Sequence, residues 1–276
     1  MSMTVRTNVA SMQAAGQLGK TQLHLSRTLE RISSGYRINR AADDAAGLGV
    51  ATALETATIS QQQGIRNAND GISIIQTAES ATNEVTDILQ RMRTLAVQSA
   101  SETLANEERS YISDEFVQLQ SEIARIAAVT EFNGVQLNDG SVSSLDVQVG
   151  INNNSQSRIA ITLGDLTTTG LGVGQATIDV LSVTAARTSL DVIDTALTSV
   201  NRSRSLLGAT QNRLDSAINN AMIYTEALSA AESQIRDADF AIETSELTKL
   251  QILQQSGVAA LAQAKNVNQS VISLLS

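Results

Sequence analysis

The stretch LQILQQSGVAALAQAKNVNQSVISLL, residues 250–275, carries the clearest structural pattern in the chain. Apolar and small residues recur in it at alternating steps of three and four, the spacing that places side chains on one stripe of an α-helix. The stripe consists of Leu250, Leu253, Gly257, Ala260, Ala264, Val267, Val271 and Leu274. Several of these residues are small, so a helix built on them needs close neighbours on more than one side. We therefore predict that the stripe is a packing seam, including packing between subunits.

Helical spacing recurs on both sides of the middle of the chain. It extends over residues 190–228, over 75–96 and over 112–126, and more weakly over 5–32. The face expected for the weakest of these helices consists of Leu25, Leu29 and Ile32. Chain ends that both carry such patterns favour an antiparallel arrangement in which the N- and C-terminal segments lie side by side.

The middle of the chain has a different pattern. Apolar and polar residues alternate over 145–149 and again over 159–163, with turn residues between them, which is typical of a β-hairpin. Residues 170–174 lack the spacing and the Lys of a phosphate-binding loop, and we interpret them as a flexible connector. The predicted fold is mainly α, a long antiparallel helical bundle or coiled coil with a small β-hairpin region at about 132–174.

Composition excludes several classes of function. The chain has 276 residues, of which 42% are hydrophobic, so it can bury a core, but only 2% are aromatic. It contains no Cys, which excludes disulfides, thiolate metal sites and Cys nucleophiles. It also contains no Pro, so long helices can continue without a Pro break.

The charge of the chain bears on its partners. The net charge of −9 argues against binding to nucleic acid or to an anionic membrane, because phosphate binding needs clustered Lys and Arg. The charged side chains of residues 1–40 are mainly basic, whereas residues 230–276 carry more acidic than basic side chains, which favours pairing of the two ends.

No window reaches the about 18 consecutive apolar residues of a membrane span, so we expect no membrane insertion. A Sec-type signal pattern is also missing at residues 1–30, which leaves the cytoplasm or an export route without a cleaved signal.

Candidate chemical groups do not form a reactive site. His24 has no cluster of Asp or Glu at ligand spacing, so we interpret it as a surface or interface residue. The pairs Asp43–Asp44 and Asp237/Asp239 lack the alternating oxygen ligands of a calcium loop, and helix capping explains them better. We therefore predict no catalytic residue, no metal site and no cofactor, and we do not expect an enzyme.

Two separate stretches carry a family resemblance. ISSGYRINRAADDAAGL, residues 32–48, resembles the N-terminal signature of bacterial flagellins. AESQIRDADF, residues 231–240, and QILQQSG, residues 251–257, are similar to the C-terminal part of the same family. The resemblance covers roughly residues 1–165 and 185–276.

This resemblance implies a minimal flagellin. Its inner terminal-helix domain would comprise residues 1–42 and 237–276, and a helical domain with the β-hairpin would comprise residues 43–236. No large variable outer domain is expected. The implied function is that of a structural subunit, which polymerises into the helical bacterial flagellar filament for swimming motility.

The resemblance also implies a location and a set of partners. The subunit would leave the cell through the flagellar export apparatus and reside in the extracellular flagellum. Its partners would be other copies of itself, an export chaperone, the filament cap and the hook-junction proteins. Two alternatives remain open on the sequence: a hook–filament junction protein of the same superfamily, or a cytoplasmic coiled-coil scaffold.

A third stretch resembles a recognition site. LQRMRTLAVQ, residues 89–98, is similar to the flagellin segment that the vertebrate Toll-like flagellin receptor recognises, with Arg91 and Leu95 at key positions and Glu115 as the third. Arg91 and Leu95 are four residues apart, so we expect them to share a helix face. Lateral packing between subunits is the alternative role of that face.

Overall fold

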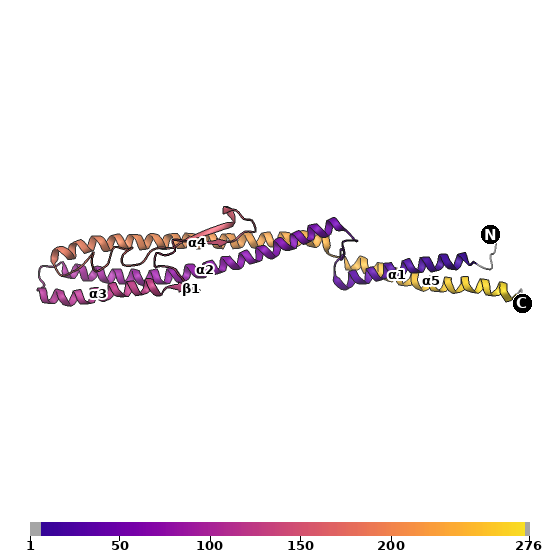
Figure 1. Cartoon of the computed structure of the whole chain (residues 1–276), viewed down its shortest axis with the longest axis horizontal. Coiled ribbons are helices and arrows are strands. Elements are labelled where there is room, and N and C mark those ends of the chain that lie inside the picture. Colours follow the sequence, from indigo (N-terminus) through magenta and orange to yellow (C-terminus); the bar gives the residue numbers. More distant parts are fainter. Residues whose placement is uncertain (1–6, 274–276) are drawn as a thin grey trace. The chain divides into compact units, whose positions relative to one another are not determined.

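The protein is mainly helical. A computed structural model describes the backbone of residues 7–273 and the side chains of residues 7–266. Its helices, in chain order, are α1 (Val9–Ser34), α2 (Ala45–Ser99), α3 (Asn106–Val129), α4 (Val183–Arg236) and α5 (Phe240–Ser273) (Figure 1). The predicted fold class is confirmed, because the helices are long and the strands are confined to the segment between α3 and α4.

The chain divides into two compact units. One consists of residues 1–56 and 227–276, and the other of residues 57–226. The domain boundaries expected from the sequence, at 42 and 237, fall inside the first unit, in or beside the short connections from α1 to α2 and from α4 to α5.

In the first unit, α1 and α5 lie side by side and antiparallel (Figure 1). Gly35 ends α1 in the left-handed conformation, with φ 77°, and its N–H donates to the carbonyl of Arg31. Asp239 precedes α5, and its carboxylate accepts hydrogen bonds from the backbone N–H groups of Ala241 and Ile242. Local capping chemistry therefore fixes where α1 ends and where α5 begins.

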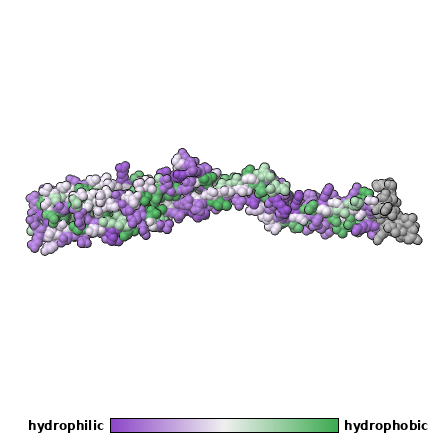
Figure 2. All heavy atoms as spheres, in the orientation of Figure 1, coloured by the Kyte–Doolittle hydropathy of each residue, from purple (hydrophilic) through white to green (hydrophobic). Residues whose placement is uncertain are grey.

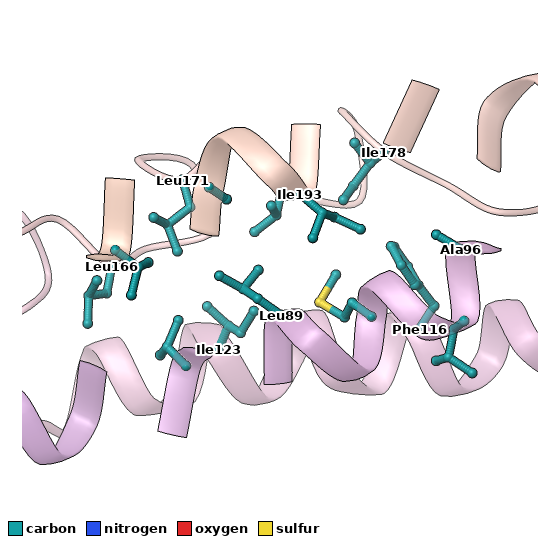
Figure 3. Close-up of a cluster of buried hydrophobic side chains, with 14 of the residues drawn as sticks. Leu89, Ala96, Phe116, Ile123, Leu166, Leu171, Ile178 and Ile193 are labelled. Carbon is teal, nitrogen blue, oxygen red and sulfur yellow. The ribbon is translucent and has the colours of Figure 1, made fainter. Parts of the chain in front are cut away.

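The second unit contains the hydrophobic core. Its first cluster joins α2, α3 and α4 around fully buried side chains such as Leu89, Phe116 and Ile193 (Figure 3). Its second cluster joins α2 and α4 to the strands through Ile75 and Leu214. The predicted stripe over 75–96 is confirmed, because its apolar members are buried.

Two antiparallel strand pairs follow α3. The first, β1 (Glu131–Phe132) with β2 (Val135–Gln136), encloses a two-residue turn in which Asn133 and Gly134 have φ 51° and 79°. The second pairs β3 (Ser144–Gln148) with β4 (Arg158–Thr162), and the 3-10 helix η1 (Ser155–Ser157) precedes β4. This second pair confirms the predicted hairpin.

The segment after β4 corrects one prediction. Residues 170–174 are not a flexible connector, because Val173 is 0% exposed and Leu171 is buried beside it. Figure 3 shows Leu171 and Ile178 of this segment pointing into the first core cluster. The buried Gln120 side chain of α3 donates to the carbonyl of Val173 at 2.8 Å, which holds the backbone of the segment in place.

Within the described residues, no helix has a stretch that is long and apolar enough to cross a membrane.

Candidate assembly interface

The predicted seam lies in the pair formed by α1 and α5. The amide of Gln254 donates to the Gln22 side chain at 2.7 Å in the middle of the pair. Towards the chain ends, the Asn8 side chain donates to the carbonyl of Ala264 at 2.9 Å. These contacts fix an antiparallel alignment of α1 and α5.

The side of α1 that packs against α5 differs from the predicted one. The buried residues of α1 are Thr21, Leu25 and Thr28. Leu29 is exposed and Ile32 is half-buried, so the predicted face was wrong except at Leu25. Two of the three buried residues are Thr, whose hydroxyl side chains do not stand out in a pattern of apolar residues, so helical spacing alone did not identify this face.

The C-terminal stripe is divided between two environments. Leu250 is 6% exposed, and Gly257 and Ala264 lie half-buried along the same side of α5. Leu253, by contrast, is 47% exposed, and Ala260 is exposed as well. The side chains of Val267 and Val271, and Leu274 entirely, lie outside the described residues. Within the described part, the stripe therefore packs partly against α1 and leaves an apolar edge open.

An apolar groove runs along this open edge. Its volume is about 260 Å³. Its apolar and small lining residues are Ala14, Leu18, Leu253, Gly257 and Ala260. A Cβ atom on Gly257 would lie 3.2 Å from Cδ1 of Leu18, so the glycine permits the close approach of the two helices.

Large apolar side chains also emerge elsewhere on α5. Ile252, Leu253 and Val258 are all exposed. Since successive residues of a helix are about 100° apart, these three side chains point to different sides of α5. Hydrophobic residues accordingly reach the visible surface over α1 and α5 (Figure 2). A helix that is apolar on several sides is typical of a buried helix. Among the described residues, however, α1 is the element that packs along α5.

The carboxylates that flank these helices act as caps. Asp44 accepts a hydrogen bond from the Gly47 N–H at the start of α2, as Asp239 does at the start of α5. This confirms the capping interpretation for both residues. Among the described residues no three His, Asp or Glu side chains are grouped to hold a metal ion, and His24 is exposed on α1.

The three residues of the expected receptor site do not share one exposed face. Arg91 on α2 and Glu115 on α3 are both exposed and form an ion pair at 2.7 Å. Leu95 is only 3% exposed and belongs to the first core cluster. Arg91 and Leu95, expected to share a helix face, lie about 40° apart around α2. The edge of the buried stripe runs between them, so Arg91 is exposed and Leu95 is buried.

An exposed ion pair also links α2 to α4. The guanidinium of Arg93 donates to Asp194 at 2.6 Å. This hydrogen bond, together with the positive charge of Arg93, lowers the pKa of the Asp194 carboxyl group. The pair is exposed, so it orients the two helices with little effect on the free energy of unfolding.

Comparisons with known proteins identify the family. Residues 5–143 match the bacterial flagellin N-terminal helical region, and residues 190–275 match the bacterial flagellin C-terminal helical region. A flagellin of Halalkalibacterium halodurans is 42% identical over 273 residues, which cover 99% of this chain and 100% of that protein. The flagellar filament 33 kDa core protein of Treponema phagedenis is 40% identical over 287 residues, with 99% and 100% coverage.

A solved structure shares the fold. It is described as a flagellar hook-associated protein from Vibrio parahaemolyticus, is 15% identical, and covers 71% of this chain and 100% of that chain with a TM-score of 0.59. At this identity the likeness concerns the fold alone. The two flagellin regions and the full-length relatives carry the assignment: the chain belongs to the bacterial flagellins, the subunits of the flagellar filament, and is not an enzyme.

Proposed function

We propose that this chain polymerises through the unit formed by α1 and α5, as a structural subunit of a helical flagellar filament. The observation that carries the proposal is the exposure of large apolar side chains on several sides of α5, among them Ile252, Leu253 and Val258. Large apolar side chains exposed around a helix, beside an apolar groove, indicate an interaction site. In a filament, neighbouring copies would cover the sides of α5 that α1 leaves open.

A filament also requires the right kind of interface. Copies that contact one another through two different surfaces form an open helical polymer when the rotation between them does not close. The groove lined by Leu253, Gly257 and Ala260 is one such surface, and the sides of α5 from which Ile252 and Val258 protrude are others. The predicted stripe also includes Val267, Val271 and Leu274, whose side chains lie outside the described residues.

Seeded growth tests this proposal. Purified full-length protein is mixed with short filament seeds and followed by electron microscopy, with unseeded protein and seeds alone as controls. We expect uniform helical tubes that lengthen from the seeds. Closed rings of fixed size would instead indicate a hook–filament junction protein, and small soluble oligomers would indicate a coiled-coil scaffold.

The same proposal includes the domain division and the export route. The inner terminal-helix domain would comprise residues 1–42 and 237–276, the remainder would form the helical domain, and no large outer domain would be present. The subunit would travel through the flagellar export apparatus with an export chaperone, meet the hook-junction proteins and fold beneath the filament cap. Export is tested by measuring the amount of the subunit in culture supernatants. Cells with an intact export apparatus are compared with cells in which this apparatus is inactivated.

Recognition by a host Toll-like flagellin receptor is a second proposal. The exposed pair Arg91 and Glu115 would contact the receptor, and the buried Leu95 would support that surface from below. We expect Arg91→Ala in the monomer to weaken receptor signalling at least about tenfold. A tenfold loss of affinity corresponds to about 1.4 kcal/mol of binding free energy, which is typical of an important interface residue. Arg125→Ala is the control, because Arg125 forms an exposed pair with Glu122 on α3. Unchanged signalling by the Arg91 variant would refute the proposal.

A further inference from the structure

We propose that Asn133 is a site of spontaneous chemical modification, at which the side-chain amide is converted to a carboxylate through a cyclic imide formed with Gly134. Asn133 is the only Asn of the sequence that is followed by Gly. The two residues form the turn between β1 and β2, and both are exposed. The proposal concerns the folded second unit and does not depend on filament formation.

The conversion needs water as its only other reactant. The backbone nitrogen of Gly134 attacks the side-chain carbon Cγ of Asn133 and loses its proton, so that a C–N bond forms. The bond from Cγ to Nδ2 breaks, and Nδ2 leaves with that proton as ammonia. Water then opens the imide ring. Attack of water at Cγ yields aspartate, and attack at the backbone carbonyl carbon yields isoaspartate, in which the main chain runs through the side chain.

The turn leaves both reacting groups accessible. Within the described part of the chain, no hydrogen bond engages the side-chain amide of Asn133 or the N–H of Gly134. A Cβ atom at Gly134 would have nothing within 4 Å, so the space beside its nitrogen is open. Glycine itself has no side chain that would hinder the attack.

The backbone of the turn acts as a brake on the reaction. Among the residues that the structure describes, Asn133 is the one other than glycine with a positive φ, at 51°, and Gly134 follows at 79°. These values are typical of a type I′ hairpin turn. Closure of the imide ring requires rotation about the Cα–C bond of Asn133, which this turn resists. The reaction rate should therefore follow the frequency with which the turn opens.

The strand pair that holds the turn is short. β1 and β2 contain two residues each, and their pairs are Glu131 with Gln136 and Phe132 with Val135. Val135 is 39% exposed, and Phe132 is half-buried against the second core cluster. An isolated strand pair is at best marginally stable, and a segment with few buried contacts opens more often than the core. The turn can therefore open without unfolding of the helices.

Two Asp–Gly pairs, which can form the same imide, are better protected. Asp70 and Gly71 lie within α2, where the helical backbone prevents closure of the ring. The carboxylate of Asp139, which precedes Gly140, accepts hydrogen bonds from the hydroxyl and the N–H of Ser141 at 2.6 and 2.9 Å. These hydrogen bonds lower the pKa of the Asp139 carboxyl group, and an ionised carboxylate is a poor target for a nitrogen nucleophile. The amide in the β1–β2 turn has neither protection.

The modification would affect the core through Leu137. This residue follows β2, is 1% exposed, and donates from its N–H to the carbonyl of Thr130 at 3.0 Å. Isoaspartate at Asn133 would lengthen the main chain and abolish the turn that pairs β1 with β2. We expect the isoaspartyl form to unfold at a lower urea concentration than the parent. Aspartate tolerates the left-handed conformation and would only add an exposed charge.

Peptide mapping by mass spectrometry measures the modification. Purified full-length protein is incubated at neutral pH, and the loss of each Asn amide is followed over time. The internal control is Asn152, which is also exposed in a loop but precedes another Asn. We expect Asn133 to be converted at least about tenfold faster than Asn152, because Gly134 carries no Cβ. A protein isoaspartyl methyltransferase with a labelled methyl donor detects the isoaspartate at the same position.

Two variants test the parts of the turn. Asn133→Gln keeps an amide but would need a larger ring, so conversion at this position should stop. Phe132→Ala weakens the strand pair and should accelerate conversion of Asn133 about threefold to tenfold, without a change at Asn152. The matched control is Val129→Ala, a truncation of an exposed side chain at the end of α3, which should leave both rates unchanged.

The outcomes decide between a reactive and a protected turn. Conversion of Asn133 no faster than that of Asn152 overturns the proposal, and so does conversion that occurs only in urea. Equal acceleration at both positions in the Phe132→Ala variant would show that the strand pair does not control the rate. If circular dichroism shows that this variant has lost its helices, Gln136→Ala replaces it, since it removes only the hydrogen bond from Gln136 to the Ala128 carbonyl. Filament growth enters none of these measurements, so failure of the assembly proposal would leave the result intact.

Discussion

Gly64 and Gly208 both lie inside long helices, but their surroundings differ. A Cβ atom at Gly64 would lie 2.5 Å from the carbonyl oxygen of Val149, next to the β3–β4 hairpin, whereas nothing lies within 4 Å of such an atom at Gly208. We expect Gly64→Ala to destabilise the protein by about 1–3 kcal/mol, because the hairpin must move away from α2. Gly208→Ala should stabilise it by about 0.5–1 kcal/mol, because alanine favours the helix. Urea unfolding followed by circular dichroism measures both; equal effects would mean that the hairpin is not closely packed on α2.

Arg109 is a buried cation without an acidic partner among the described residues. Its guanidinium donates to the carbonyls of Ser99 and Ser101, at 3.1 and 2.6 Å, and to the side chain of Asn106 at 3.3 Å. These acceptors include the last carbonyl of α2, where the negative end of the helix dipole favours a positive charge.

Arg109→Ala should therefore be strongly destabilising. Loss of three hydrogen bonds at a buried helix end should lower the free energy of unfolding by about 2–4 kcal/mol. Arg125→Ala removes an exposed guanidinium from the same helix and should cost less than about 0.5 kcal/mol. Denaturant midpoints of the two variants provide the measurement, and a small effect at Arg109 would show that water replaces its hydrogen bonds.

At the scale of elements, the segment between β4 and α4 is part of the core although it has no regular structure. Leu166 is 1% exposed, whereas Leu181 of the same segment is 55% exposed. We expect Leu166→Ala to cost about 2–5 kcal/mol through the cavity that it leaves. Leu181→Ala should change the stability by less than about 0.5 kcal/mol. If both variants unfold at the same denaturant concentration as the parent, Leu166 does not contribute to the core and the segment is not packed as described.

Sequence reasoning succeeded where residues repeat with a fixed period. The spacing from Ile75 to Ala96 predicted part of α2, and the alternation around Val147 and Ile161 predicted the hairpin. It failed for residues 170–174 because an irregular segment has no period, and its Gly content gives no sign that Val173 is buried. Long-range hydrogen bonds, such as the one from Gln120 to the Val173 carbonyl, leave no pattern in a single sequence.

The candidate interface was predictable only in part for a similar reason. Helical spacing located the stripe on α5 but could not say which of its residues face α1. The structure distinguishes Leu250, which is buried in the subunit, from Leu253, which is exposed three residues later. The contact between Arg236 and Tyr36 joins two residues that lie far apart in the sequence. Both residues belong to the stretches that carry the family resemblance, but a single sequence does not show that they touch.

At the scale of the whole molecule, the core is distributed unequally between the two units. Both clusters of buried apolar side chains, including Phe116 and Ile75, belong to residues 57–226. In the pair of α1 and α5, small and polar residues such as Thr21 and Thr28 take their place. A pair of helices with so little buried apolar area depends on neighbours for most of its stability. The second unit therefore supplies the stability of the subunit, and the first is available for assembly.

Introduction of a charge on the open side of α5 tests this division of roles. Leu253→Glu places a carboxylate in the apolar groove, where an assembled neighbour would remove it from water without a partner. We expect seeded filament growth to slow at least about tenfold. The free energy of unfolding of the free subunit, measured in urea, should change by less than about 0.5 kcal/mol, because Leu253 is half exposed there. The matched control is Ile151→Glu, the same kind of change in the exposed loop between β3 and β4, which should leave growth intact. Normal growth of the Leu253 variant would exclude the groove from the interface, whereas equal inhibition by both variants would show that growth responds to net charge and not to the groove.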